Sequence, residues 1–447
     1  MQTGWNEKDK IHLRAPKGWI NDPNGFIYYK GKYHLFYQHF PYAPRWATMH
    51  WGHAVSEDLV HWEHQDIALF PTKYEDQNGC FSGSAIEHEG VMNLFYTGVH
   101  YDKINPEDVH LALDDEFQSA QLRITSEDGI HFDNFRDKQV IIPAIENPMM
   151  GHKTHTRDPK VWRGNDAWYL VLGSSTADRK GELLFYKSMD LVNWEFVNAA
   201  STEEPLGWMW ECPDYFETEG GEVLLVSPMG IGAEGTGEKN HTVCMNVRFD
   251  EQNCSMEFAK EYRYMDYGFD LYAPQSTTDA EGKRVMVAWL RMPVPFEEGR
   301  IGMYCLPRLV EVKNDHIYFK PHPNVEQMYS RRITDIMQAD PAGYRVSLDL
   351  NDGEGINVGG YQIWRQGNRI LTDRREVFPA CENRENFCMQ SKTPELKDGF
   401  HLDVYVNRNV IEVFVNHGEY VISHAVYGCK WQLEAAEEKQ MELYTLA

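Results

Sequence analysis

Short apolar runs bounded by turns dominate the first 320 residues of the chain. Five segments resemble one another, because each has a Gly or Asn/Asp turn followed by a run of β-branched and aromatic residues. They begin at Gly31, Gly90, Asn165, Gly221 and Gly282. A shorter segment, SEDLVHW from Ser56, recurs from Ser126 and Ser188 and predicts a polar turn followed by an outer strand. Long apolar periods of 3.6 residues are almost absent here, so the pattern predicts an all-β domain.

The repeats also predict how the strands are arranged. Each unit is too small to bury its own faces, and five such units fit radial stacking around one axis. We therefore predict a five-bladed β-propeller over residues 1–320. A stretch with two prolines predicts a linker over 321–340, and alternating apolar and polar positions over 341–447 predict a C-terminal β-sandwich.

Three acidic residues stand shortly before three of the repeated segments. They are Asp22 in WINDPNG, Asp158 in TRDPKVW and Glu211 in WECPDYF. Because the innermost strands of a propeller line one central channel, acids at one phase of successive blades are expected to share a pocket. Each acid taken alone reads equally well as part of a turn, since Asp before Pro or Gly accepts backbone hydrogen bonds. Because all three acids stand at a similar position before their repeated segments, we favour the interpretation that they share a pocket.

Aromatic residues flank these acids and indicate a sugar ligand. Trp19, Trp208 and Trp210 can stack on the apolar faces of a sugar ring while its hydroxyls reach the carboxylates. Two carboxyl groups on either side of an acetal bond can hydrolyse it with retention or inversion, depending on a separation that the sequence leaves open.

The surroundings of each acid suggest its role. Glu211, among tryptophans and near other acids, is expected to stay protonated and act as the general acid. Asp22, beside the amides of Asn21 and Asn24, is expected to be the ionised nucleophile. Asp158, next to Arg157 in sequence, is expected to stay charged and bind sugar hydroxyls.

Charge and composition exclude several classes of partner. The 43 Lys and Arg against 68 Asp and Glu give a net charge of −25, which repels nucleic acid and anionic membrane surfaces. No apolar stretch is long enough to span a membrane, and the first residues do not resemble a signal peptide. Eight scattered cysteines without a CxxC pair favour reduced thiols, so we expect a cytoplasmic protein.

The histidines between residues 34 and 64 do not predict a metal site. In a strand, His50 and His53 point to opposite faces, and no Cys or acid has zinc-site spacing with them. We expect His50 to be a polar lining residue near Trp46, and we expect no metal and no cofactor.

Five ordered motifs resemble glycoside hydrolase family 32, which contains invertases, sucrose-6-phosphate hydrolases, inulinases and levanases. The motifs are WINDPNG from Trp19, FYQ from Phe36, FSGS from Phe81, RDP from Arg157 and ECPD from Glu211. The match continues through YAPQ, AWL and LPR to IEVFVNHGE, where Asn407, Arg408 and Asn409 precede the motif in place of the family's usual Asp-Arg-Ser. The resemblance therefore covers nearly the whole chain.

The resemblance implies a propeller with a β-sandwich and a retaining double displacement at a β-fructofuranoside. Asp22 would be the nucleophile, Glu211 the acid/base and Asp158 the transition-state stabiliser. The residues expected to bind substrate are Asn21, Asn24, Gln38, Trp46, Phe81, Ser82, Arg157, Tyr272 and Trp289.

The identity of the substrate stays open at this stage. Sucrose, sucrose 6-phosphate and short fructo-oligosaccharides all fit, and a phosphate would need a cation at the pocket mouth, for which Arg45, His50 and Lys73 are the candidates. A fructosyltransferase would carry the same motif residues, and a non-catalytic carbohydrate-binding propeller would keep the aromatic walls without the acids. The sequence does not show the oligomeric state.

Overall fold

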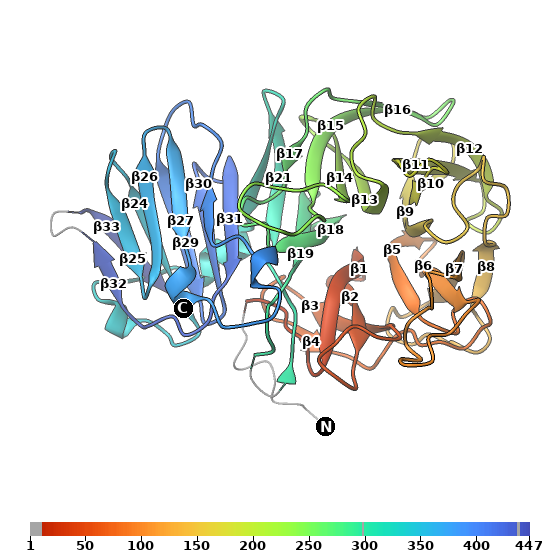
Figure 1. Ribbon diagram of the computed structural model, residues 1–447, viewed down its shortest axis with the longest axis horizontal. Coiled ribbons are helices and arrows are strands. Elements are labelled where there is room, and N and C mark those ends of the chain that lie inside the picture. The colour runs from red at the N-terminus through yellow and green to blue at the C-terminus, as the bar shows by residue number, and fades with distance from the viewer. Residues whose placement is uncertain (1–10, 297–298, 436–438) are drawn as a thin grey trace.

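The computed structural model describes residues 11–296, 299–435 and 439–447 and consists almost entirely of β-strands (Figure 1). The only α-helix in these ranges is the short α1 (Pro323–Met328). The prediction of an all-β chain is therefore confirmed. No helix within the described ranges is both long and apolar enough to cross a bilayer.

Five antiparallel sheets follow one another along the chain from residue 19 to residue 321. The first has β1 (Trp19–Tyr29), β2 (Lys32–Phe40), β3 (His50–Ser56) and β4 (Glu63–His64). The second has β5 (Cys80–His88), β6 (Val91–Tyr101), β7 (Phe117–Ser126) and β8 (Gln139–Ile142), and the third has β9 (Arg157–Arg163), β10 (Trp168–Ser175), β11 (Gly181–Ser188) and β12 (Glu195–Ala200). The fourth has β13 (Met209–Thr218), β14 (Gly221–Met229), β15 (Val243–Asp250), β16 (Ser255–Phe258) and β17 (Arg263–Tyr264). The fifth has β18 (Leu271–Thr278), β19 (Arg284–Leu290), β20 (Met303–Tyr304), β21 (Arg308–Lys313) and β22 (His316–Pro321).

The first strands of these sheets form a closed ring. β1 contacts β5, β5 contacts β9, β9 contacts β13, β13 contacts β18, and β18 contacts β1 again. The chain before β1 also joins the last sheet, because Arg14 bridges to Met303 and Trp19 to Ile301. Side chains on the five innermost strands therefore meet around one axis, as in a β-propeller.

The shorter sequence repeat contains the predicted polar turn, but the outer strand starts later than predicted. In SEDLVHW the Ser56 hydroxyl accepts hydrogen bonds from the amides of Asp58 and Leu59, and Asp58 accepts from the amides of Val60 and His61. The segment is therefore the turn between the third and fourth strands, and the outer strand begins only at residue 63. Side-chain hydrogen bonds to local backbone decide this, because they compete with strand pairing.

Two further sheets form the C-terminal sandwich, which lies on the left in Figure 1. One contains β23 (Arg331–Ile333), β24 (Gly343–Asp349), β29 (His401–Asn407), β30 (Val410–Val415), β31 (Tyr420–Ala425) and β33 (Met441–Thr445). The other contains β25 (Gly355–Val358), β26 (Tyr361–Gln366), β27 (Arg369–Asp373), β28 (Gln390–Lys392) and β32 (Leu433–Ala435). The stretch expected to be a linker thus contains α1 and also β23, which pairs with β33 as an edge strand of the sandwich.

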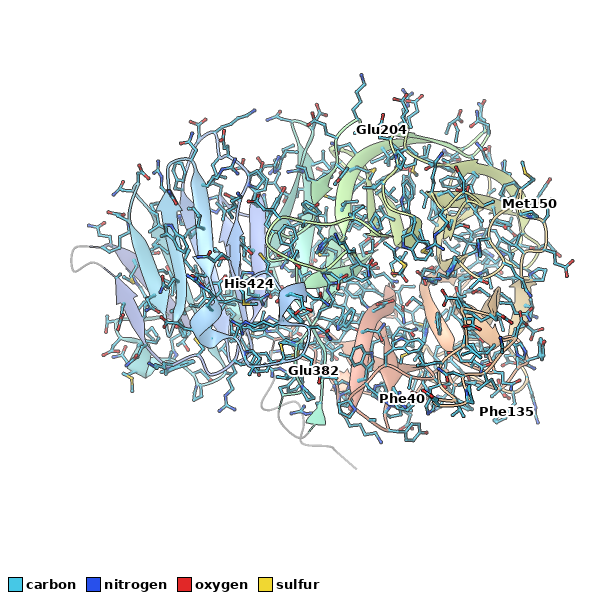
Figure 2. All side chains as sticks on the ribbon, in the orientation of Figure 1. Phe40, Phe135, Met150, Glu204, Glu382 and His424 are labelled. Carbon is cyan, nitrogen blue, oxygen red and sulfur yellow. The ribbon has the colours of Figure 1, made fainter. Side chains whose placement is uncertain are left out.

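Side chains fill the junction between the sandwich and the ring of sheets (Figure 2). One apolar cluster crosses it and includes Val310 and Phe319 from the fifth sheet and Tyr405 and Phe414 from the sandwich. His424, labelled in Figure 2, is fully buried on β31 and accepts or donates hydrogen bonds with Tyr361 and Ser391. The two domains are therefore packed through a continuous core.

Candidate active site

Each of the five innermost strands is interrupted at the same level by a β-bulge, where two residues oppose one on the neighbouring strand. A proline stands at this level in four of the strands, as Pro23, Pro159, Pro213 and Pro274. Proline favours the bulge because it has no N–H to donate to the strand ladder. Asp158, Cys212 and Ala273, which precede three of these prolines, have left-handed backbones with φ of 65°, 47° and 49°.

The bulges turn consecutive side chains toward one central cavity of about 500 Å³. Asn21 and Asp22, Phe81 and Ser82, and Arg157 and Asp158 all line it. We expected the three acids at equivalent positions of their strands. The strand register instead makes Cys212, not Glu211, the residue equivalent to Asp158. Glu211 stands one residue earlier and lines the cavity nevertheless, because a bulged strand does not alternate its faces strictly.

Asp22 is held by donors on both of its oxygens. The Ser82 hydroxyl donates to Oδ2 at 2.5 Å, and the Asn21 amide donates to Oδ1 at 3.1 Å. Trp19 in turn donates its indole N–H to Oδ1 of Asn21 at 2.7 Å. This chain of hydrogen bonds fixes the carboxylate in the cavity wall.

Cys212 connects the carboxylates of Asp22 and Asp158. Its Sγ lies 3.5 Å from Oδ2 of each, and its backbone N–H donates to Asp158 Oδ2 at 2.9 Å. The left-handed backbone at Cys212 aims this N–H at the carboxylate. Nothing in the sequence indicated this role except the proline that follows Cys212.

Glu211 accepts hydrogen bonds from two other strands. Arg157 donates to Oε1 from Nη2 at 2.9 Å and from Nε at 3.2 Å, and the Tyr272 hydroxyl donates to Oε2 at 2.7 Å. Arg157 is the sequence neighbour of Asp158, but its hydrogen bonds go to Glu211. The apolar setting expected for Glu211 is likewise replaced by three polar donor groups.

Burial and crowding of the acids change their acidity. Burial, together with the nearby charge of Glu211, raises the pKa of Asp22 to about 6 in spite of its hydrogen bond from Ser82. Burial raises the pKa of Asp158 to about 7, although Arg157 acts in the opposite direction. The contacts expected to keep both aspartates ionised are therefore opposed by burial, in a cavity that three acids share with one guanidinium.

Aromatic rings form much of the cavity wall. Trp46 meets Phe81 edge to face at 5.8 Å between ring centres, and Trp19 meets Trp289 similarly at 5.7 Å. Trp208 also lines the cavity, whereas Trp210, two residues later, is fully buried in the core between the third and fourth sheets and donates to the Leu206 carbonyl. The expectation that Trp210 faces a sugar is therefore wrong.

The structure places most of the predicted binding residues at this cavity. Those that line it are Asn21, Gln38, Trp46, Phe81, Ser82, Arg157, Tyr272 and Trp289. Asn24 does not, because it is fully buried between β1 and β5 and accepts a hydrogen bond from the Gly83 amide. The lining residues that the sequence did not single out are Tyr101, Leu111, Ala112, Asp115, Phe117, His155 and Met229.

None of the three cations suggested for a phosphate lines the cavity. Arg45 is paired with Asp108 at 2.7 Å, His50 bonds the Thr48 carbonyl at 3.0 Å, and Lys73 donates to the Phe135 carbonyl at 3.0 Å. The side chains in the described part of the chain that are spaced for a metal ion lie outside this cavity, on the sandwich.

Comparison with known families decides the relationship of this chain. The N-terminal domain of glycosyl hydrolases family 32 matches residues 12–321, and the C-terminal domain of that family matches residues 335–445. The chain belongs to glycosyl hydrolase family 32. The resemblance recognised in the sequence motifs is thereby confirmed.

Similar proteins of family 32 come from several organisms. The chain is 33% identical to a sucrose-6-phosphate hydrolase of Escherichia coli, across 97% of this chain and 91% of that protein. It is 32% identical to a raffinose invertase of Escherichia coli, with the same coverage. Among solved structures, a family 32 β-fructofuranosidase of Bombyx mori has a TM-score of 0.82 and 28% identity, covering 98% of this chain and 93% of the other.

Proposed function

We propose that this chain is a retaining β-fructofuranosidase that hydrolyses the terminal fructosyl unit of sucrose, sucrose 6-phosphate or short fructo-oligosaccharides without a cofactor. The observation that carries the proposal is that Asp22, Asp158 and Glu211 converge on one aromatic-walled cavity of a family 32 chain. The sucrose-6-phosphate hydrolases and the raffinose invertase among its relatives support the substrate class.

The contacts suggest a role for each acid in a double displacement. Asp22, fixed by Ser82 and Asn21, attacks the anomeric carbon and forms a fructosyl-enzyme. Glu211, positioned by Arg157 and Tyr272, donates a proton to the leaving oxygen and then removes one from the attacking water. Asp158, held by the Cys212 amide, binds sugar hydroxyls and stabilises the positive charge that develops on the ring.

Two isosteric substitutions test these roles. Asp22→Asn and Glu211→Gln should each lower kcat for glucose release from sucrose by roughly 10³-fold or more, because each removes a group that acts in the reaction. Glu217→Gln is the matched control, since Glu217 lies on the same strand as Glu211 but is exposed to solvent. Retention of more than a tenth of the activity in either site variant would overturn the assignment.

The stereochemistry of the product tests the double displacement separately. Two inversions at the anomeric carbon release β-D-fructofuranose first, which NMR spectra taken during the first minutes of hydrolysis would record. An initial α-anomer would show single displacement with the same carboxylates.

We also propose that Arg179 is the cation that receives a phosphate on the glucosyl unit. Its guanidinium lies over the ring of Trp208, a cavity wall residue, at 4.2 Å from the ring centre. Arg179 is exposed, and among the described residues no carboxylate forms an ion pair with it. An unpaired guanidinium beside the cavity of an acidic protein suits a dianionic group.

Replacement of this cation should affect only the phosphorylated substrate. We expect Arg179→Ala to lower kcat/KM for sucrose 6-phosphate by about 10-fold to 100-fold and to change that for sucrose less than 3-fold, as one charge-assisted contact predicts. Lys180→Ala is the control, because Lys180 is a neighbouring exposed cation already paired with Asp178. Equal losses on both substrates would exclude a phosphate contact at Arg179.

A further inference from the structure

Two histidines and an aspartate converge at one end of the six-stranded sheet of the sandwich, far in sequence from the catalytic acids. His401 and Asp403 are two residues apart on β29, so their side chains share one face of the strand. His417 belongs to the turn between β30 and β31. Their potential ligand atoms all lie within 4.8 Å of one another. The inward residues of β29, Leu402 and Val404, fill the sandwich core, so this group lies on the opposite face.

The distances resemble those between ligands of one metal ion. Asp403 Oδ2 lies 3.4 Å from His401 Nε2 and 3.9 Å from His417 Nδ1. In a tetrahedral zinc site with bonds of about 2.0–2.2 Å, neighbouring ligand atoms are about 3.4 Å apart. His417 is 71% exposed, so a small rotation of its side chain closes the remaining gap.

The surroundings orient both inner ligands toward the same point. Arg345 donates to Oδ1 of Asp403 at 2.8 and 3.1 Å, which leaves Oδ2 directed at the two imidazoles. His401 Nδ1 lies 3.1 Å from Oδ1 of Asp349, so the second ring nitrogen, Nε2, is the one that faces Asp403, with the Ser347 hydroxyl at 3.3 Å from the same nitrogen. A carboxylate on the far nitrogen of a ligating histidine is the usual support in protein metal sites.

We propose that His401, Asp403 and His417 bind one divalent transition-metal ion, of the class of zinc, with water completing the coordination. Two imidazoles and one carboxylate oxygen suit Zn²⁺, Ni²⁺ or Cu²⁺, whereas Mg²⁺ and Ca²⁺ prefer a larger set of oxygens. The carboxylates of Asp403, Asp349 and the nearby Glu326 of α1 outnumber the two nearby cations, Arg345 and Lys320, so the site accepts a cation.

The position of the site indicates what the ion would do. Gly418, next to His417, accepts a hydrogen bond from the Phe319 amide on β22 at 2.9 Å, so this turn joins the sandwich to the fifth sheet. An ion bound to β29 and to this turn would fasten the turn to the sandwich at the junction of the two domains. None of the three residues lines the catalytic cavity, so the ion would stabilise the protein without acting in hydrolysis.

The test is a titration of the chelator-treated full chain with ZnCl₂ by calorimetry. We expect one ion per chain with micromolar or tighter affinity, a melting temperature raised by several degrees, and unchanged sucrose hydrolysis. With Co²⁺, the visible absorption bands of a four-coordinate ion should appear. MgCl₂ should produce none of these effects.

Variants distinguish this site from other surface histidines. His417→Ala and His401→Ala should each weaken Zn²⁺ binding at least 10-fold, and His417 stands in an exposed turn where the fold does not depend on its ring. His131→Ala is the matched control, because His131 is also exposed and bonded to one carboxylate, Asp128 at 2.6 Å, but has no second imidazole. The proposal fails if no saturable binding occurs below 1 mM, or if both site variants bind as the wild type does.

Discussion

Two groups of acids in this chain share different numbers of cations. In the cavity, Asp22, Asp158 and Glu211 share the single guanidinium of Arg157. At the junction of the domains, two guanidinium groups serve three acids: Arg308 bonds Glu412 at 2.6 Å and Asp266 at 3.1 Å, and Arg374 bonds Asp270 at 2.8 Å.

The contrast appears in the acidity of the two groups. Burial raises the pKa of Asp22 to about 6 and that of Asp158 to about 7. Burial acts on Glu412 in the same direction, but Arg308 and His12 hold its pKa at about 2. Burial still raises the pKa of Asp266, the second acid bonded to Arg308. The difference teaches that burial alone does not decide the state of an acid, and that the cations and hydrogen bonds around each carboxylate decide it too.

Breaking the junction should have the largest effect on stability. Arg308→Met leaves Glu412 and Asp266 buried without their cation, so the free energy of unfolding should fall by about 3–5 kcal/mol. Urea unfolding followed by tryptophan fluorescence measures this. A double variant, Arg308→Met with Glu412→Gln, should recover part of the loss, and a loss below 1 kcal/mol in the single variant would contradict the assigned role of this network.

Removing one acid from the cavity should instead increase the stability of the protein. The folded-state pKa of Asp158 lies above its unfolded value, so the folded chain binds more protons between about pH 4 and 7 and loses stability as the pH rises through that range. Asp158→Asn removes this loss and should raise the free energy of unfolding by roughly 1–3 kcal/mol at pH 8.

The same substitution should reduce activity. Thermal unfolding at several pH values measures the stability gain, which should shrink toward pH 4. The rate of sucrose hydrolysis at pH 6 should fall by roughly 10²-fold or more. A lower melting temperature than wild type at pH 8 would show that Asp158 stabilises the fold after all.

The smallest expected change concerns the pH profile. The Ser82 hydroxyl lowers the pKa of Asp22, so Ser82→Ala should raise it from about 6. Because the nucleophile must be ionised, activity falls as pH falls through this pKa, and the acidic limb of kcat/KM should move to higher pH by up to about one unit. A limb that stays in place would mean that Asp22 does not govern it.

The sequence was most informative where local rules apply. Apolar runs after Gly and Asn/Asp turns predicted strands, and the recurrence of those runs predicted sheets arranged around an axis. The X-Pro pairs also mark the bulges, because a missing N–H disrupts strand pairing wherever it occurs. The same local rules explain the SEDLVHW turn, where Ser56 and Asp58 accept hydrogen bonds from nearby backbone amides.

Contacts between sheets were not readable in the same way. Arg157 precedes Asp158 in sequence but bonds Glu211 on the next sheet, and only one of Trp208 and Trp210 faces the cavity. Neighbours in sequence on a strand point in different directions, and a bulge changes which one faces inward.

The sequence by itself thus determined the all-β class, the family and the identity of the three acids brought to one cavity. Tertiary structure alone decided which cation each acid meets, that Cys212 joins two of the carboxylates, and that His401, Asp403 and His417 converge. The physical reason is that strand propensity and turn chemistry act over a few residues, whereas charge pairing and ligand geometry depend on side chains brought together from distant strands.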